Sequence, residues 1–215
     1  FSDFQVIFHN NASSDRTYEI IREYQESEPL GKVELFNYKT AAGGLEYGQR
    51  IRWFPHRSEY VSLRSANDLI SPEYLQKCVE ILDSDSRVGL AYSNGYLVYE
   101  DDPTVGYHSK SIEIRTSIDD LEGSVENCVD RYTQSFALWG VYRRSVYEAL
   151  STWRLTCYGA DHVHICESSL YGSVIPTETP LDIRVVRGSK GSTSSYDDIR
   201  SMWNSHHFMQ NSEMP

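Results

Sequence analysis

The order of apolar segments at the start of the chain constrains the fold more than any other feature. A short apolar run at Phe4–Phe8 ends in polar residues, and apolar side chains then recur at helical spacing at Tyr18, Ile21 and Tyr24. A second strand candidate follows at Val33–Phe36. A strand, a helix and a second strand in this length form a βαβ unit, whose strands are parallel. The sequence therefore predicts an α/β fold with a mixed, mostly parallel sheet flanked by helices.

Later segments extend this sheet. The clearest helix follows Ser71 and Pro72 and carries an apolar stripe from Leu75 to Leu82. The stretch beyond Asp101 is polar, and we expect it to be a connection. The other expected elements are strands at 60–63, 88–92, 174–175 and 183–186, helices at 121–132 and 161–172, an extended segment leading into a short helix at 135–150, and a segment at 38–54 that allows a helix.

The composition fits one globular domain. The chain has 215 residues, of which 40% are hydrophobic and 24% charged, and this suits a single buried core. No apolar run approaches the roughly 20 residues of a membrane-spanning helix. The net charge of −11 argues against a nucleic-acid partner, because phosphate binding relies on clustered Lys and Arg. We expect one domain at residues 1–187 and a Ser-, Gly- and Asn-rich tail at 188–215.

The four cysteines give no sign of a metal site or a disulfide framework. Cys78, Cys128, Cys157 and Cys166 show no CxxC spacing, and three of them fall within helical patterns at or beside apolar positions. Reduced thiols that pack in the core are the simplest interpretation. Reduced thiols suit a cytoplasmic protein. Its expected location includes the inner face of the membrane.

Three polar clusters carry the chemical signal. They are NNASSDRT at 10–17, SAND at 65–68 and GAD at 159–161, and each follows a strand candidate or precedes a helix. The carboxyl ends of strands are where α/β proteins bind ligands. In this order the clusters resemble the signature of the inverting, family 2 glycosyltransferases, over roughly residues 3–188. The resemblance implies a single nucleotide-binding domain of the glycosyltransferase type A fold.

The resemblance implies a sugar transfer from a nucleoside diphosphate sugar to a hydroxyl of a glycan or lipid-linked acceptor. An in-line displacement needs a base for the acceptor hydroxyl, and the resemblance gives that role to Asp161. It also needs positive charge at the departing diphosphate, which Mn²⁺ or Mg²⁺ supplies from oxygen ligands. Asp68 is the expected metal ligand. Arg143 is a candidate for the acceptor or the phosphates, because a guanidinium matches phosphate geometry.

Several positions depart from the family pattern. Asn10 stands where the family has an aspartate at the nucleoside, while Asn11, Ser13 and Asp15 keep the rest of that element. Ser65 and Asn67 replace carboxylates of the metal-binding element. We expect Asn10, Asn11, Asp15, Ser65 and Asn67 to contact the nucleotide. At the substituted positions the contacts would be made by uncharged groups. The family's first strand and helix are absent before the first residue, so the sequence is a piece of a longer protein or another segment takes their place.

Simpler roles stay open for the same residues. Asp15 and Asp161 each precede or begin a helix, where a carboxylate caps the backbone, and Asp68 fits an ordinary polar loop. Glu167 lies in the same predicted helix as Asp161 and is a weaker catalytic candidate. His162 and His164 are two residues apart, on different faces of that helix, so they do not predict a paired metal site.

The replaced carboxylates leave two other classes of function open. One is a binding module that keeps the fold and some affinity for a nucleotide sugar or carbohydrate without catalysis. The other is a structural or interaction domain, for which no nucleotide would raise the thermal stability. Hydrolysis of nucleotide sugars with and without manganese separates the enzyme from the binding module.

Overall fold

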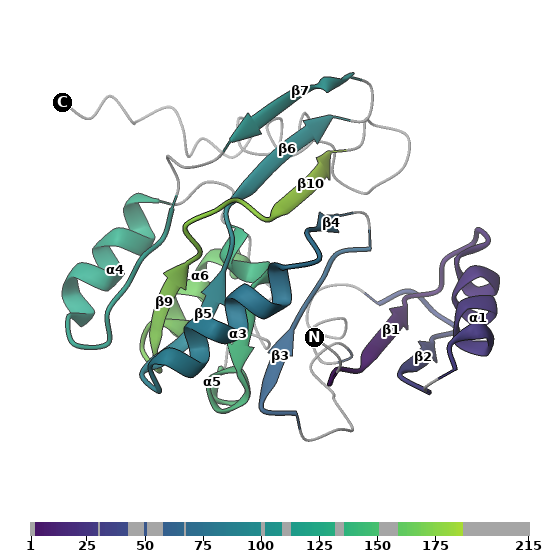
Figure 1. The fold of residues 1–215 in the computed structure, drawn as a ribbon, viewed down its shortest axis with the longest axis horizontal. Helices are drawn as coiled ribbons and strands as arrows, with labels where there is room; N and C mark the ends of the chain where they lie inside the picture. The colour runs from purple at the N-terminus through teal and green to yellow at the C-terminus, as the bar shows by residue number, and fades with distance from the viewer. Residues whose placement is uncertain are drawn as a thin grey trace.

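The computed structural model describes residues 3–29, 31–42, 50, 58–66, 68–99, 102–108, 113–131, 136–150 and 159–186. Helices and strands of these residues pack into the arrangement of Figure 1. In chain order they are β1 (Val6–Asn10), α1 (Thr17–Ser27), β2 (Val33–Asn37), β3 (Tyr60–Ser62), β4 (Leu69–Ile70), α3 (Tyr74–Ser84), β5 (Val88–Tyr92), β6 (Gly95–Tyr99), β7 (Asp102–His108), α4 (Leu121–Asp130), the 3-10 helix η2 (Phe136–Trp139), β8 (Val141–Arg143), α5 (Arg144–Ala149), α6 (Ala160–Ser168), β9 (Ser173–Pro176) and β10 (Asp182–Val186).

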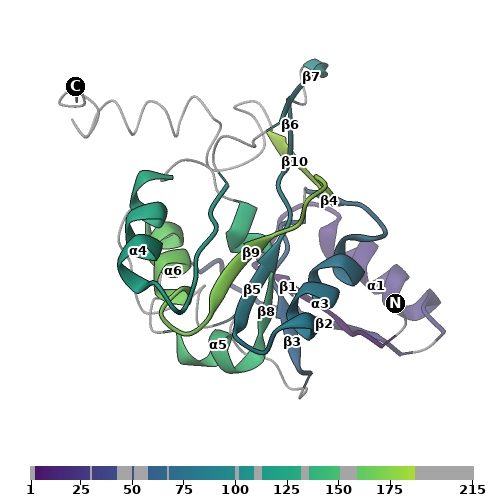
Figure 2. The ribbon, with the colours of Figure 1, turned by 60° about the vertical axis from the view of Figure 1, so that its left-hand side comes forward.

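The main sheet has the strand order β3-β8-β5-β9. Strand β8 is antiparallel to β3 and β5, whereas β5 and β9 are parallel. The helix α3 covers one face, and α5 and α6 lie on the other (Figure 2). Helix α4 packs outside α6. The predicted α/β class with a mixed sheet flanked by helices is confirmed, although antiparallel pairs outnumber parallel ones among the described strands.

Both faces of the main sheet are buried, because neighbouring residues of a strand point to opposite sides. On β8, Val141 packs with α3, and the next residue, Tyr142, packs with α5 and α6. On β5, Leu90 and Ala91 divide in the same way. Every residue of β5 is buried, as expected of a central strand.

The main sheet continues into a second one. Strand β5 leads through Ser93 and Asn94 into β6, and β9 leads through a short loop into β10. The parallel pairing of β5 with β9 is followed by parallel pairing of β6 with β10. At the junction, the backbone N–H of Leu181 bonds the Asn94 carbonyl oxygen at 3.2 Å and the Ser93 hydroxyl at 2.7 Å. This junction lies at the carboxyl ends of β5 and β9.

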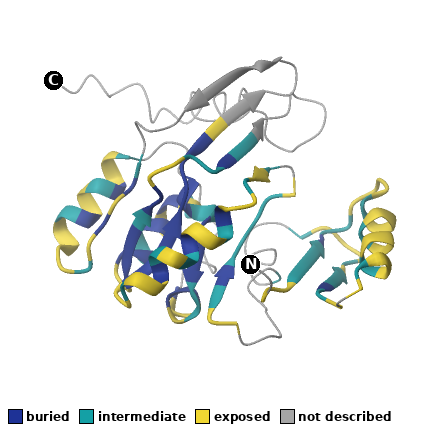
Figure 3. Cartoon of the chain, viewed as in Figure 1, coloured by how far each residue is buried: buried dark blue, intermediate teal, exposed yellow. Residues whose placement is uncertain are grey.

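The first βαβ unit forms a separate two-stranded sheet. Strands β1 and β2 are parallel, as predicted, and α1 packs on them. No residue of α1 is buried, and Tyr24 remains 53% exposed. Figure 3 shows the contrast with the buried main sheet. Among the described residues, β1 pairs with β2 and with no strand of the main sheet.

Two expectations for the secondary structure were wrong in detail. The segment beyond Asp101 is not a plain connection, because β7 covers residues 102–108 and pairs antiparallel with β6. Helix α6 ends at Ser168, and Gly172 is not its left-handed cap. Gly172 instead passes very close to Gly89: a Cβ built on Gly172 would lie 2.7 Å from the Gly89 Cα. The segment 43–49, part of the possible helix at 38–54, and the tail at 188–215 fall outside the described residues.

In the part of the chain that the structure describes, no helix is long and apolar enough to span a lipid bilayer.

Candidate active site

Arg64 and Asp182 form a buried ion pair where the two four-stranded sheets meet. Arg64 follows β3, and Asp182 begins β10. The Arg64 Nη1 and Nη2 atoms lie 2.8 and 2.9 Å from the two carboxylate oxygens of Asp182, whose residue is 1% exposed. Two parallel N–H···O bonds fix the orientation of both planar groups. The pair therefore holds the carboxyl end of β3 against the start of β10.

Tyr74 and Trp139 surround this ion pair. Arg64 Nη1 and the Tyr74 hydroxyl both donate to the Trp139 carbonyl oxygen, each at 3.0 Å. The Arg64 guanidinium carbon lies 5.0 Å from the centre of the Tyr74 ring, within cation–π range. Burial raises the pKa of Tyr74 far above its usual value, so its hydroxyl stays protonated and donates. These contacts join β3, η2 and the first turn of α3 at one point.

Arg184 is the residue on which the charges of the site converge. Its guanidinium carbon lies 4.7 Å from the centre of the Phe136 ring. Burial lowers the pKa of Arg184, whereas the negative charges of Asp68, Asp182 and Asp161 oppose that shift. A guanidinium has so high an intrinsic pKa that it stays charged. Arg184 is therefore a half-buried cation whose charge interacts with those of three carboxylates.

Asp68 and Asp161 reach Arg184 from different elements. Asp68 is half-buried in the loop before β4, where its backbone N–H bonds the Ser65 carbonyl oxygen at 3.4 Å. Asp161 is exposed in the first turn of α6. The residue that precedes this helix, Gly159, has a left-handed φ of 75°. The charges of both aspartates act on Arg184. The roles of Asp68 as metal ligand and of Asp161 as base stay predictions.

Asn10 lies buried at the carboxyl end of β1. Its Nδ2 donates to Asn37 Oδ1 at 2.7 Å, and its Oδ1 accepts from the backbone N–H of Ser13 at 3.2 Å. Asn37 ends β2, so the amide pair joins the ends of the two strands. One Asn10 amide hydrogen and one oxygen lone pair are not used by these bonds.

Asn11 joins the loops that follow β1 and β2. Its amide exchanges two hydrogen bonds with the backbone of Ala42, at 2.8 and 2.9 Å. Arg50 Nη1 also donates to Asn11 Oδ1 at 3.0 Å, while the Arg50 guanidinium lies 4.2 Å from the centre of the Tyr38 ring. The Asn11 oxygen is therefore saturated, and one Nδ2 hydrogen is left for a further partner.

Asp15 acts at the start of α1. Its Oδ1 accepts from the backbone N–H of Thr17 at 3.0 Å and from the Thr17 hydroxyl at 2.5 Å. Asp15 therefore has the helix-capping role that the sequence also allowed. In α6, by contrast, no side chain caps the helix start, so Asp161 lacks the capping role that the sequence allowed.

Arg143 lies away from the position expected for an acceptor or phosphate ligand. Its Nε donates to the Val88 carbonyl oxygen at 3.1 Å and its Nη2 to the Leu82 carbonyl oxygen at 2.7 Å. Val88 begins β5 and Leu82 lies in the last turn of α3, so these contacts are at the amino end of β5. Arg184 lies beyond the opposite, carboxyl end of β5, on β10 of the second sheet. The sequence did not predict the position of Arg143, because β8 runs antiparallel to β5 and its carboxyl end lies at the amino end of β5. Asn67 falls outside the described residues.

The helix α6 holds two buried histidines that do not form a metal site. His164 packs edge-on against Tyr142, with ring centres 5.6 Å apart, and burial lowers its pKa to about 4. Burial also lowers the pKa of His162. Glu167 is half-buried, and its charge opposes the shift at His164. No group of three or more His, Cys, Asp or Glu side chains among the described residues is arranged to hold a metal ion by itself.

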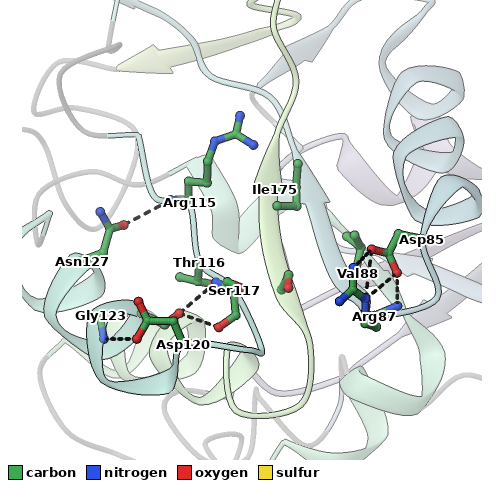
Figure 4. A pocket seen from close by; sticks show the side chains of 12 residues that line it. Asp85, Arg87, Val88, Arg115, Thr116, Ser117, Asp120, Gly123, Asn127 and Ile175 are labelled. Atoms are coloured by element: carbon green, nitrogen blue, oxygen red, sulfur yellow. Dashed lines mark hydrogen bonds and ion pairs between the residues drawn. The ribbon is translucent and has the colours of Figure 1, made fainter.

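A cavity of about 440 Å³ lies at the amino ends of β5 and β9, away from this site (Figure 4). Its walls include Val88 and Ser173, the first residues of β5 and β9. The polar groups around it bind one another: Asp120 caps α4 by accepting from Gly123 N–H, and Arg87 pairs with Asp85 and Asp119. We therefore place the candidate site at the opposite end, where Arg64, Asp182 and Arg184 converge with the two predicted aspartates.

Sequence reasoning did not single out Arg64, Asp182 or Arg184. Arg64 directly follows a strand candidate, in the same polar cluster as Asp68, and this signal was available. Asp182 and Arg184 belong to a late segment with the plain pattern of a strand. Their role depends on contacts with residues far away in the chain.

No protein-family model and no curated protein sequence matches the chain. Among solved structures, the chain is similar to the crystal structure of residues 1–349 of TarS from S. aureus, with a TM-score of 0.55 and 14% sequence identity. The similarity covers 86% of this chain and 52% of the TarS chain, so the chain spans about half the length of that structure. TarS is a glycosyltransferase. The fold is thus one that a glycosyltransferase uses.

Proposed function

We propose that this chain transfers a sugar from a nucleoside diphosphate sugar to a hydroxyl of a glycan or lipid-linked acceptor, with inversion at the anomeric carbon. The observation that carries the proposal is that the charges of Asp68 and Asp161 both act on Arg184. These residues come from three distant parts of the sequence, and we place the site beside the carboxyl ends of the main strands, where α/β folds bind ligands. The fold shared with a glycosyltransferase agrees with it.

Asp161 is the proposed base. It is exposed, so an acceptor can reach it, and it is not occupied in capping α6. In an in-line displacement, the carboxylate takes the proton of the acceptor hydroxyl as the oxygen attacks the anomeric carbon. The bond from that carbon to the diphosphate oxygen breaks on the opposite face, which inverts the configuration.

The charges of the site support a divalent cation that arrives with the nucleotide. Three carboxylates and two guanidiniums, at Asp68, Asp161, Asp182, Arg64 and Arg184, leave one net negative charge. A diphosphate placed there needs added positive charge. Mn²⁺ or Mg²⁺ fits, since such ions are often held by one or two carboxylates together with substrate phosphates. Asp68 would hold the ion, the ion would supply positive charge for the leaving diphosphate, and Arg184 is the cationic side chain proposed to face the same phosphates.

The loops after β1 and β2 are the proposed nucleoside site. The unused amide hydrogens of Asn10 and Asn11 suit the polar edges of a base or ribose, and Asp15 is the proposed acidic contact beside them. Ser65 and Asn67 are the proposed contacts on the side of the second cluster. An uncharged Asn10 in the place of an aspartate is also what favours the alternative, a module that binds nucleotide sugars without turning them over.

The test is hydrolysis and transfer with a panel of nucleoside diphosphate sugars, with and without Mn²⁺. The variant Asp161→Asn is expected to lower kcat by roughly 10²–10⁴-fold and to leave nucleotide binding almost unchanged. Glu122→Gln is the matched control, since Glu122 is also an exposed carboxylate in the first turn of a helix. Binding without turnover at every metal concentration would favour the module, and the absence of any nucleotide-dependent thermal shift would contradict both.

A further inference from the structure

Cys128 and Cys166 lie together between two packed helices. Cys128 is in the last turns of α4, and Cys166 is near the end of α6. The helices pack against each other, and both side chains belong to the same apolar core. The structure records both as free thiols. The two thiols are hydrogen-bonded to each other, so the tertiary fold brings together two sulfur atoms that the sequence separates.

The two thiols differ in access and in acidity. Cys128 is 1% exposed, whereas Cys166 is half-buried and partly accessible to solvent. The hydrogen bond from Cys128 lowers the pKa of Cys166, with burial acting against it. The same hydrogen bond, together with burial, raises the pKa of Cys128. The thiolate therefore forms first at Cys166, the thiol that a solute can reach, and a thiolate is the reactive form.

We infer that Cys128 and Cys166 form a dithiol–disulfide pair, a modification site that takes small disulfides such as glutathione disulfide as oxidant. The Cys166 thiolate attacks one sulfur of the oxidant, a mixed disulfide forms on Cys166, and the first glutathione thiolate leaves. The Cys128 thiol then loses its proton and attacks the Cys166 sulfur, which releases the second glutathione thiolate. The protein loses two electrons and two protons, and the oxidant becomes two thiols.

The closed pair would join α4 covalently to α6. Helix α4 packs on α6 and has several exposed apolar side chains, so α6 provides much of its attachment. Helix α6 also carries Asp161 in its first turn. The inference does not depend on the proposed sugar transfer, because the thiol chemistry needs only the pair itself.

Cys78 is the internal control. It is fully buried in the other core, beneath α3, and its side chain is hydrogen-bonded to Tyr74. Burial raises the pKa of Cys78 to about 12, and a buried thiol of that kind is inert. It has no second thiol beside it among the described cysteines.

The experiment treats the folded chain with glutathione disulfide, blocks remaining thiols with N-ethylmaleimide, and maps the peptides by mass spectrometry. The expected product is a peptide pair linked through Cys128 and Cys166, lighter by two hydrogens and reopened by dithiothreitol, with Cys78 untouched. In Cys128→Ser, Cys166 should hold a lasting mixed disulfide with glutathione. In Cys166→Ser, Cys128 should not react while the chain is folded.

Three results would overturn the inference. One is a wild-type chain in which Cys166 stays fully alkylated after oxidation. Another is a link from Cys166 to Cys157 instead of Cys128. The third is a mixed disulfide that persists on wild-type Cys166. The wild-type map decides these outcomes even if a serine variant does not fold.

Discussion

Arg64 and Asp182 are 118 residues apart in the sequence, and their side chains meet in a two-bond ion pair that is almost closed to solvent. The pair fixes the junction between the two sheets, and the charges of both residues act on Arg184. Removal of this ion pair should therefore lower the stability of the folded chain.

The variant Arg64→Gln should reduce the free energy of unfolding by about 3–5 kcal/mol, because it leaves the buried Asp182 charge without its partner. Denaturant unfolding measures this. Arg87→Gln removes a guanidinium that is bound to Asp85 and Asp119 at the surface, and it should change the stability far less, because solvent screens exposed ion pairs. Equal losses in the two variants would contradict the structural role of the buried pair.

Burial of His164 predicts a loss of stability in mild acid. Its folded pKa is about 4, below its ordinary value of 6.5, so the unfolded chain binds the proton more readily. The contribution is complete above about pH 6.5 and is lost as the pH falls toward 4, by roughly 3 kcal/mol in all. In His164→Asn, the free energy of unfolding should fall less steeply across this window. Parallel curves for the two proteins would disprove the prediction.

The contact between Gly172 and Gly89 predicts that neither position accepts a side chain. In Gly172→Ala, the new Cβ would meet the Gly89 backbone at 2.7 Å, and overpacking of this kind costs about 1–3 kcal/mol. Gly31→Ala is a useful comparison, since Gly31 has a φ of 63° and no atom near its Cβ position. That variant should lose about 1 kcal/mol from backbone strain alone. Thermal unfolding of both variants measures whether Gly172→Ala loses more stability than Gly31→Ala.

Removal of the Asp68 carboxylate should weaken the metal dependence of the proposed reaction. In Asp68→Asn, the Mn²⁺ concentration for half-maximal binding in the presence of a nucleoside diphosphate should rise about tenfold or more, because the ion loses a charged oxygen ligand. Calorimetry measures this without turnover. Asp119→Asn, at an exposed carboxylate far from Arg184, should leave the value unchanged. An unaltered value in Asp68→Asn would remove Asp68 from the metal site.

Arg143 is expected to stabilise the fold and not to bind the substrate. Arg143→Met removes the hydrogen bonds to the Leu82 and Val88 carbonyl oxygens, and this should cost about 1–3 kcal/mol. Nucleotide affinity, measured by calorimetry well below the unfolding transition, should not change. Weaker nucleotide binding at unchanged stability would restore the role that the sequence indicated.

The sequence by itself determined most of the helices and strands. The first βαβ unit, the helix after Pro72 and the buried strand Val88–Tyr92 all lie where the apolar period placed them. Periodicity succeeds here because an amphipathic helix or a buried strand is specified by residues that are near one another in the chain. The hairpin strand β7 was missed, since Asp, Pro and Gly in that segment read as a connection.

Only the tertiary structure decided which side chains meet. The sequence offered Asp68 as a metal ligand and Asp161 as a base of one site, and the fold added Arg64, Asp182 and Arg184 as charged residues whose fields act with theirs. It also moved Arg143 to the other end of the sheet and set Cys128 beside Cys166. These pairings depend on strand order, strand direction and helix packing, which arise when distant segments bury a shared apolar surface. No local pattern of residues encodes that choice.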